Sequence, residues 1–195
     1  SWRYQERDKV GMPLRILIVG GSLGAQALNE RVPEALKQLN VPLSVYHQCG
    51  QNHAEATRAR YENAPANLQV EVQPFIEDMA KAYSDADLVI CLLPLTPDTT
   101  NFLNTERLSV FKQGAILVNV ARGALVDDAA LLAALDSGQL QAACLDVFRQ
   151  EPLPVADPYW QHPAVLVTPH CSAVTNVDTA IHQIVENYQR TLNGL

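Results

Sequence analysis

The sequence predicts an α/β protein built on a single doubly wound parallel sheet, with helices on both faces and therefore three layers. Three observations support this class. Short runs of Val, Ile and Leu recur along the chain, amphipathic segments separate them, and Gly or Pro stands at most junctions. Strands that alternate with helices form parallel sheets with right-handed crossovers, and buried parallel strands read as continuous apolar runs.

The first half of the chain contains four of the expected strands. Leu14–Val19 reads as a buried strand, and Gly20–Gly24 leads into a helix over residues 25–39, in which Pro33 is a local conflict. The other expected strands are Leu43–His47, Gln69–Val72 and Asp87–Leu93, and the other helices cover 54–61 and the segment from 77 to 83. Residues 1–13 read as a helix end that leads into the first strand.

The second half repeats the alternation. Its expected strands are Ala115–Val120, Ala142–Phe148 and Val165–Val167, and its expected helices cover 105–111, 127–135 and 175–192. In the common strand order 3-2-1-4-5-6, the first and fourth strands are neighbours. We therefore expect Leu14–Val19 to pair with Asp87–Leu93, with the ligand crevice between them.

The bulk composition excludes several classes of function. A net charge of −7 and a pI near 5.1 argue against a nucleic-acid partner, and no apolar run approaches the length of a membrane span. The N-terminus lacks the apolar core of a signal peptide. Four scattered cysteines read as reduced thiols, mostly buried, so we expect a cytoplasmic protein without a metal site.

Three expected strands each deliver one ionisable residue just past their C-terminal ends. These residues are Arg122, Glu151 and His170. The C-terminal ends of parallel strands share one edge of the sheet, where open α/β sheets bind their ligands. A carboxylate beside an imidazole and a guanidinium can bind a substrate carboxylate and move a proton to or from a carbinol. The alternative is a buried ion pair with surface charges.

The same segment resembles the D-2-hydroxyacid dehydrogenases, especially their glyoxylate/hydroxypyruvate reductase branch. The matching motifs are Asn119-Val-Ala-Arg-Gly123, Leu145-Asp-Val-Phe148, Glu151-Pro-Leu-Pro154 and Thr168-Pro-His170. The resemblance implies a Rossmann-like nucleotide-binding domain in which Arg122 holds a 2-oxo acid, His170 is the acid/base and Glu151 tunes His170. It also implies a cofactor site, for which the candidate residues are Gly21, Ser22, Gly24, Pro94, Thr99, Val120, Arg122, Asp146 and His170.

The first half resembles a different family. The runs RILIVGGSLGAQALNERVPEAL, SVYHQCGQNH and VQPFIEDMAKAYSDADLVIC are similar to the C-terminal domain of GT-B peptidoglycan N-acetylglucosaminyltransferases of the MurG type. That resemblance implies that Gly20–Ala25 faces a donor diphosphate and that Phe75–Met79 lies near a uracil.

The two resemblances predict an engineered chimera that forms one hybrid Rossmann-like domain over residues 1–195. Residues 1–13 are the lead-in helix, 14–89 the glycosyltransferase-like half and 90–195 the dehydrogenase-like half. The join falls inside the fourth strand, where Leu88–Leu92 satisfies the apolar pattern of either parent. Since the first and fourth strands come from different parents, we expect the seam to be the ligand crevice itself.

The glycine loop matches a dinucleotide fingerprint only in part. Aligned on Gly21 and Gly24, the pattern G-x-G-x-x-G places Val19 at its first position, so the turn glycine is out of register. The helix N-terminus with Ser22 can still hold a phosphate through backbone N–H groups and the helix dipole. The loop is a candidate for a dinucleotide site or for a simple anion nest, and the alternative is a tight turn that binds nothing.

The second strand does not end in the Asp or Glu that binds the ribose of NAD, nor in the Arg that accommodates the additional phosphate of NADP. It ends in Tyr46–Cys49, and we expect His47 to be a surface residue and His53, His162 and His182 to face solvent. The missing contact removes a charge-assisted hydrogen bond of about 1.5–3 kcal/mol and with it the selectivity between cofactors.

Three functions stay open. The leading hypothesis is a chimeric scaffold without a complete active site and without either parental reaction, since we find no counterpart of either parent's second domain. The first alternative is the nucleotide-binding domain of an NAD(P)-dependent 2-hydroxyacid dehydrogenase that retains weak binding of NAD or NADP. The second is a weak UDP-sugar binder. The dehydrogenase resemblance also implies a homodimer formed through the nucleotide-binding domain, of which the Pro-rich stretch before Val165 and the final helix are retained here.

Overall fold

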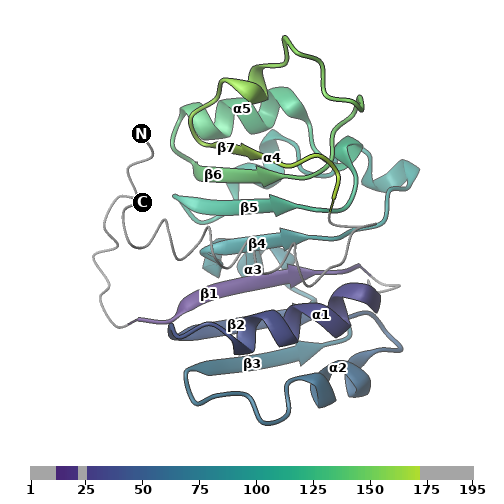
Figure 1. Ribbon diagram of the computed structural model, residues 1–195, viewed down its shortest axis with the longest axis vertical. Helices are drawn as coiled ribbons and strands as arrows, with labels where there is room; N and C mark the ends of the chain where they lie inside the picture. The colour runs from purple at the N-terminus through teal and green to yellow at the C-terminus, as the bar shows by residue number, and fades with distance from the viewer. Residues whose placement is uncertain (1–11, 22–25, 172–195) are drawn as a thin grey trace.

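The computed structural model describes residues 12–21 and 26–171 of the chain, which form a seven-stranded parallel sheet in the order β3-β2-β1-β4-β5-β6-β7 (Figure 1). The strands are β1 (Leu14–Val19), β2 (Leu43–Gln48), β3 (Leu68–Gln73), β4 (Leu88–Cys91), β5 (Ala115–Asn119), β6 (Leu140–Leu145) and β7 (Val165–Val167). The predicted fold class is confirmed. The final helix and the lead-in helix of the prediction lie outside the described residues.

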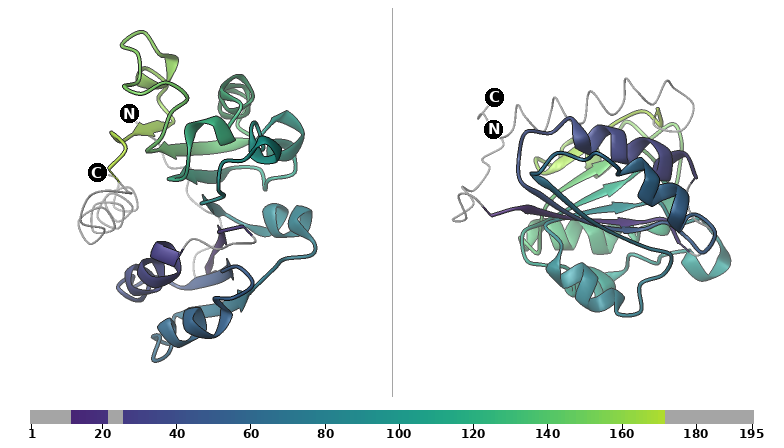
Figure 2. Two further views of the ribbon diagram at one scale, coloured as in Figure 1. Left: turned by 90° about the vertical axis from the view of Figure 1, so that its right-hand side faces the viewer. Right: turned by 90° about the horizontal axis from the view of Figure 1, so that it is seen from below.

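Helices cover both faces of the sheet (Figure 2). The α-helices are α1 (Gln26–Lys37), α2 (Ala54–Arg60), α3 (Met79–Asp85), α4 (Thr105–Ser109) and α5 (Asp128–Asp136), and the 3-10 helices are Pro97–Thr99, Gly123–Leu125 and Pro158–Trp160. The helices α1 and α2 lie on one face, and α3, α4 and α5 lie on the other. Among the described helices, none is both long and apolar enough to cross a membrane.

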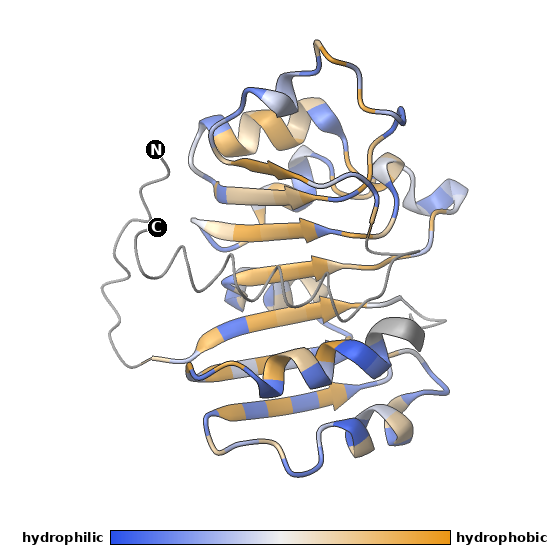
Figure 3. Ribbon diagram, in the orientation of Figure 1, coloured by the Kyte–Doolittle hydropathy of each residue, from blue (hydrophilic) through white to orange (hydrophobic). Residues whose placement is uncertain are grey.

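The alternation of side chains along β1 divides the core between the two faces. Ile16 and Ile18 pack with residues of α1, whereas Leu17 and Val19 belong to the cluster that contains α3 and α5. Because both faces of β1 are covered from Ile16 to Val19, this part of the strand is apolar without interruption, whereas Arg15 near its start is exposed. β3 instead alternates between apolar and polar residues, which appear as stripes in Figure 3, and its polar face is open to solvent.

The expected pairing of the first and fourth strands is confirmed. β1 pairs with β4 in parallel, and the register runs from Ile16 beside Leu88 to Val19 beside Cys91. β4 also pairs with β5, so the predicted seam is a continuous part of the ladder. The switch point of the sheet, where chain order reverses, therefore lies between β1 and β4.

Side-chain caps explain why several helices begin where they do. The carboxylates of Asp78 and Asp127 and the amide oxygen of Asn104 each accept a hydrogen bond from the backbone N–H three residues later. Such N-caps satisfy one of the donors that a helix start leaves open. Pro33 lies inside α1 and is buried, so the expected conflict is tolerated within an unbroken helix.

Candidate active site at the carboxyl edge of the sheet

The three predicted catalytic residues follow three adjacent strands. Arg122 follows β5, Glu151 follows β6 and His170 follows β7, and these strands are neighbours in the sheet. Because all strands are parallel, their C-terminal ends lie on one edge. The structure brings Glu151 and His170 into direct contact, whereas the Arg122 guanidinium hydrogen-bonds within its own loop.

Glu151 holds the imidazole of His170. His170 Nδ1 lies 2.6 Å from Glu151 Oε2, and the backbone N–H of Phe148 donates to Glu151 Oε1 at 2.9 Å. Partial burial by itself raises the pKa of Glu151, but the hydrogen bonds from Phe148 and His170 outweigh it, and the pKa lies below its usual value. With Nδ1 directed at the carboxylate, Nε2 is the nitrogen left to exchange a proton with a ligand.

Arg122 projects from a turn that is fixed by Asn119. The buried Asn119 side chain donates through Nδ2 to Arg122 O at 3.1 Å and accepts from the Ala121 N–H at 3.1 Å. The exposed guanidinium turns back on its own loop, where Nη1 donates to Ala121 O at 2.6 Å. Among the described residues, an approaching anion has only this one hydrogen bond of the guanidinium to displace.

The turn after Arg122 requires glycine. A Cβ on Gly123 would lie 1.9 Å from the carbonyl carbon of Phe148, which is far inside van der Waals contact. The loop after β5 therefore packs directly on the peptide group that precedes Arg149, and the N–H of the same Phe148 residue holds Glu151. The sequence predicted Arg122 from its place just past the end of an apolar run, but it did not predict the contact of Gly123 with Phe148, for which the glycine itself is the only sequence signal.

Asp146 ties the end of β6 to the segment after β7. Its Oδ1 accepts from Thr168 Oγ1 at 2.5 Å, from the Cys171 N–H at 3.0 Å and from Cys171 Sγ at 3.4 Å. Burial and the Asp146 carboxylate raise the pKa of the Cys171 thiol, so the thiol keeps the proton that it donates. Asp146 thus fixes the backbone on which His170 stands; the sequence predicted Asp146 as a site residue but missed Thr168 and Cys171.

The glycine loop and the loop after β4 meet each other. Gly21 has φ +73°, and a Cβ there would lie 3.1 Å from Pro94 Cδ and 3.3 Å from Leu93 Cδ2. Thr99 Oγ1 donates to Pro94 O at 2.7 Å and so shapes the second loop. The candidate residues Gly21, Pro94 and Thr99 are therefore brought together, whereas the predicted Ser22 and Gly24 lie outside the described residues.

The prediction that His47 is a surface residue is wrong. His47 is fully buried, its Nε2 lies 2.9 Å from Asn29 Oδ1, and its Nδ1 lies 3.0 Å from the Tyr61 hydroxyl. Asn29 Nδ2 donates to Cys49 O, so Oδ1 must accept from His47 Nε2–H, and Tyr61 donates to Nδ1. Burial lowers the pKa of His47 to about 4, so the ring is neutral and joins α1, β2 and the end of α2.

Two further histidines differ from the expectation. His162 is largely buried, lies 3.3 Å from Asp136 Oδ1 and accepts from the Ala164 N–H through Nδ1, so its predicted exposure is wrong. His53 is half-buried, and His182 lies outside the described residues.

The end of β2 carries an unsatisfied amide. Gln48 is the last residue of β2 and is 4% exposed, and its buried Oε1 has no hydrogen-bond partner among the residues that the structure describes. Its backbone carbonyl accepts from the Gly20 N–H at 3.2 Å, which places Gln48 directly beside the glycine loop. An orphaned acceptor of this kind costs free energy unless a ligand or water supplies a donor.

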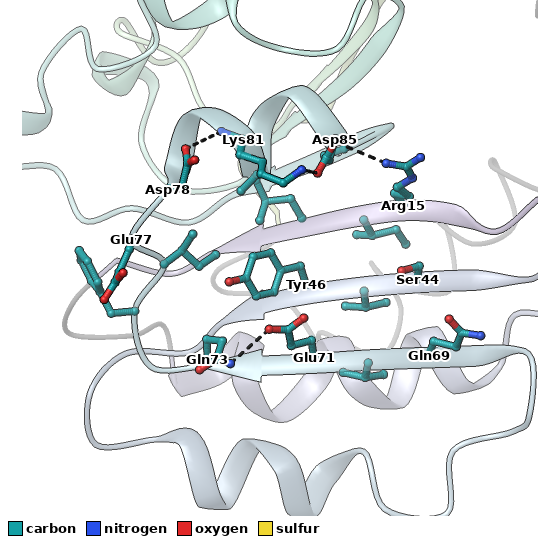
Figure 4. Close-up of a pocket in the computed structure, with 18 residues that line it drawn as sticks. Arg15, Ser44, Tyr46, Gln69, Glu71, Gln73, Glu77, Asp78, Lys81 and Asp85 are labelled. Carbon is teal, nitrogen blue, oxygen red and sulfur yellow. Dashed lines mark hydrogen bonds and ion pairs between the residues drawn. The ribbon is translucent and has the colours of Figure 1, made fainter.

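A concavity of about 740 Å³ lies away from these residues, on the open face of β1, β2 and β3 beside α3 (Figure 4). Tyr46 stands on its floor, and partial burial together with the carboxylates of Glu71 and Glu77 raises the pKa of the Tyr46 hydroxyl. None of the catalytic or cofactor candidates lines this concavity, but Phe75–Asp78, which belong to the segment predicted to lie near a uracil, do line it. Within the described ranges, no group of three or more His, Cys, Asp or Glu residues could hold a metal ion.

Comparison with known proteins gives two kinds of similarity. The family model described as the NAD binding domain of D-isomer specific 2-hydroxyacid dehydrogenases matches residues 19–172. A crystal structure of such a dehydrogenase from Xanthobacter autotrophicus Py2 is 34% identical with a TM-score of 0.64, and the match covers 100% of this chain and 58% of that one. A structure from the same organism in complex with NADPH and MES is 34% identical with a TM-score of 0.61, over 99% of this chain and 72% of that one.

The second similarity concerns only part of the chain. The UDP-N-acetylglucosamine–N-acetylmuramyl-(pentapeptide) pyrophosphoryl-undecaprenol N-acetylglucosamine transferase of Acinetobacter baylyi is 71% identical over 91 residues. The match covers 47% of this chain and 25% of the transferase. The chain thus spans about a quarter of the curated relatives that it matches and 58% of the first solved structure.

Proposed function

Because the chain belongs to the family of the NAD-binding domain of D-isomer specific 2-hydroxyacid dehydrogenases, we propose that it binds NAD or NADP at the carboxyl edge of its sheet. The observation that carries this proposal is the Glu151–His170 contact of 2.6 Å beside the Arg122 turn. This arrangement suits a 2-hydroxy acid or 2-oxo acid, which offers a carboxylate for the guanidinium and a carbinol or carbonyl oxygen for the imidazole.

The residues around the switch point fit a dinucleotide. The buried Oε1 of Gln48, which has no partner among the described residues, can accept a hydrogen bond from a ribose hydroxyl. It lies at the strand end where dinucleotide-binding domains bind the ribose. No Asp, Glu, Lys or Arg stands in Tyr46–Cys49, and the buried His47 is neutral, so this strand end offers no charge that would separate NAD from NADP. The loops that carry Gly21 and Pro94 would form the walls of the site.

Each catalytic candidate then has a separate task. The cofactor supplies a hydride donor or acceptor when it is bound. His170 Nε2 gives a proton to the substrate oxygen or takes one from it, and Glu151 stabilises the charged imidazole and fixes the ring. Arg122 binds and orients the substrate carboxylate. Asp146 holds the backbone on both sides of His170 in place through Thr168 and Cys171.

Ligand-induced thermal stabilisation tests the binding function. A ligand at 100 times its Kd stabilises a protein by about 2.7 kcal/mol, which is several degrees for a domain of this size. We expect NADH and NADPH to raise the melting temperature. Gln48→Met should weaken either cofactor about tenfold while leaving the free protein no less stable, since the variant removes an orphaned acceptor.

Gln141→Met is the matched control, because Gln141 also carries a buried, unpartnered amide atom but lies in β6. It should leave cofactor affinity unchanged. Equal loss of affinity in both variants, or no shift with either cofactor, contradicts the proposal. A hydroxypyruvate or glyoxylate reductase assay at high protein concentration tests the chemistry. If the wild type turns over no faster than the His170→Ala variant, His170 has no catalytic role.

We also propose that the chain is one hybrid domain over residues 1–195, with the halves 14–89 and 90–195 joined in β4. The identity of 71% over 91 residues with a glycosyltransferase supports a foreign half, and the family model over 19–172 supports one continuous fold. A single unfolding transition seen by both near-UV and far-UV circular dichroism would agree with a shared core. Separate transitions of the two halves would contradict it.

The glycosyltransferase similarity favours a second candidate function, the binding of a UDP-sugar through residues 20–25 and Phe75–Ile76. UDP-N-acetylglucosamine in the same melting experiment separates the candidates. A rise in melting temperature with this ligand alone supports the second function. No rise with any of the three nucleotides supports a scaffold without parental activity. The cytoplasmic location stays a prediction.

A further inference from the structure

Within the described part of the chain, β3 forms one edge of the sheet and pairs with β2 alone (Figure 1). Concavities lie on both of its faces. The one of about 740 Å³ opens over its polar side chains, and another of about 550 Å³ lies on the side of α2, lined by Leu68, Val70 and Val72. An edge strand with open space on both sides can accept a further strand.

The outward-facing backbone groups of β3 can be assigned from its contacts with β2. Asn67 O accepts from the Leu43 N–H, and Gln73 O accepts from the Cys49 N–H, so the odd-numbered residues of β3 face β2. Leu68, Val70 and Val72 therefore turn their backbone groups toward the free edge.

Two of these outward groups are already used. The Leu68 N–H donates to Pro65 O at 2.9 Å, and Val72 O accepts from Arg58 Nη2 at 3.0 Å. Leu68 O, Val70 N–H, Val70 O and Val72 N–H form no hydrogen bond with any part of the chain that the structure describes. The edge thus presents equal numbers of donors and acceptors in its centre.

The order of residues in β3 is self-complementary about Val70. In an antiparallel pair of two copies, Val70 faces Val70, Leu68 faces Val72 and Gln69 faces Glu71. The central valines exchange two hydrogen bonds, and each Val72 N–H reaches a Leu68 O, so all four open groups of each copy are used. The Leu68 N–H and Val72 O, which face each other in this pair, are held by Pro65 O and Arg58 and add no hydrogen bond between the copies. The apolar side chains meet on the α2 side, and the polar ones meet on the other.

The pairing of Gln69 with Glu71 across the two copies is also electrostatically favourable. Gln69 and Glu71 are exposed and project from β3 into the groove of Figure 4, where Glu71 Oε1 accepts from Gln73 Nε2 at 3.2 Å. In the antiparallel pair, Gln69 and Glu71 occupy the closely spaced, non-hydrogen-bonded positions. Each carboxylate then faces an amide that can donate to it, and the two-fold axis repeats the contact.

We propose that a second copy of this chain docks on the β3 edge and forms an isologous dimer with one continuous sheet. The surface differs from the Pro-rich stretch and final helix that the sequence suggested. A single strand pair buries little area, so the association is reversible and depends on concentration.

Sedimentation velocity over a hundredfold range of protein concentration tests the proposal, with Q69K and Q69E as a matched pair at an exposed position. Q69K creates two symmetric ion pairs with Glu71 and should tighten the dimer about tenfold at low salt; Q69E creates two repulsions and should weaken it about tenfold. High salt should reduce both effects. Circular dichroism melts confirm that both variants fold.

Leu166→Lys, at an exposed position of the opposite edge strand β7, is the positional control and should leave the association unchanged. A monomer at every concentration overturns the proposal. So does an association that Q69K and Q69E change equally, or one that Leu166→Lys abolishes.

Discussion

The buried His47 should make the stability of the fold depend on pH below neutrality. The pKa of His47 falls from 6.5 to about 4 in the native state because burial disfavours the charged ring. In the unfolded chain the ring titrates near its usual value, so between about pH 6.5 and pH 4 the unfolded state binds the additional proton. The free energy of unfolding is therefore fully present above pH 6.5 and falls as the pH drops below it.

The magnitude follows from the two pKa values. One pKa unit corresponds to 1.36 kcal/mol, so the difference between 6.5 and about 4 is worth about 3 kcal/mol. About 2 kcal/mol of this is lost by pH 5, where the protein is still expected to fold. Protonation would also place a hydrogen on Nδ1, where the Tyr61 hydroxyl now donates.

Urea unfolding of the wild type and of His47→Gln at steps from pH 8 to pH 4.5 measures the effect. Glutamine keeps a donor and an acceptor but does not titrate, so the other titrating groups cancel in the difference between the two proteins. We expect the wild type to be the more stable at pH 8 and its advantage to shrink by about 2 kcal/mol by pH 5. A difference that stays constant with pH would refute the assignment of the neutral ring.

Two further predictions concern the carboxyl edge. Gly123→Ala should destabilise the protein by about 3 kcal/mol in urea unfolding, because its Cβ would overlap the Phe148 carbonyl carbon; Gly114→Ala, which has a positive φ and open space, should cost only about 1 kcal/mol, and equal losses would contradict the packing argument. Glu151 has a lowered pKa, so its stabilisation is present above the usual carboxyl pKa and is lost as the pH falls through the lowered one. Glu151→Gln should therefore show a smaller loss of stability between pH 6 and pH 3 than the wild type, and parallel curves would count against the contact with His170.

Strands could be predicted well where an apolar run ends at a turn residue. β1 and β7 have the predicted bounds, since Gly20 and Thr168-Pro169 follow their apolar residues directly. The strand predicted at Ala142–Phe148 instead ends at Leu145. Val147 is buried and Phe148 packs against the core, and a run of apolar residues does not reveal whether its backbone pairs with a neighbouring strand.

The helix starts differ from the predictions for a similar reason. α3 begins at Met79 because the Asp78 side chain caps it, although the apolar pattern already begins at Ile76. Ile76 is buried in the core as part of the loop. A residue can be buried without being helical, and the pattern of hydrophobic residues predicts mainly which residues are buried.

The sequence by itself determined the alternation of strands and helices, the carboxyl edge on which the chemistry gathers, and the pairing of Glu151 with His170 as an expectation. These features follow from local apolar periods and from the chirality of crossovers, which act over short stretches of chain. Only the tertiary structure decided that His47 is buried and neutral, that Gly123 touches Phe148, and that Arg122 turns back on its own loop. Each of these depends on contacts between residues distant in sequence or on the course of a side chain, and close packing sets them only once the sheet is assembled.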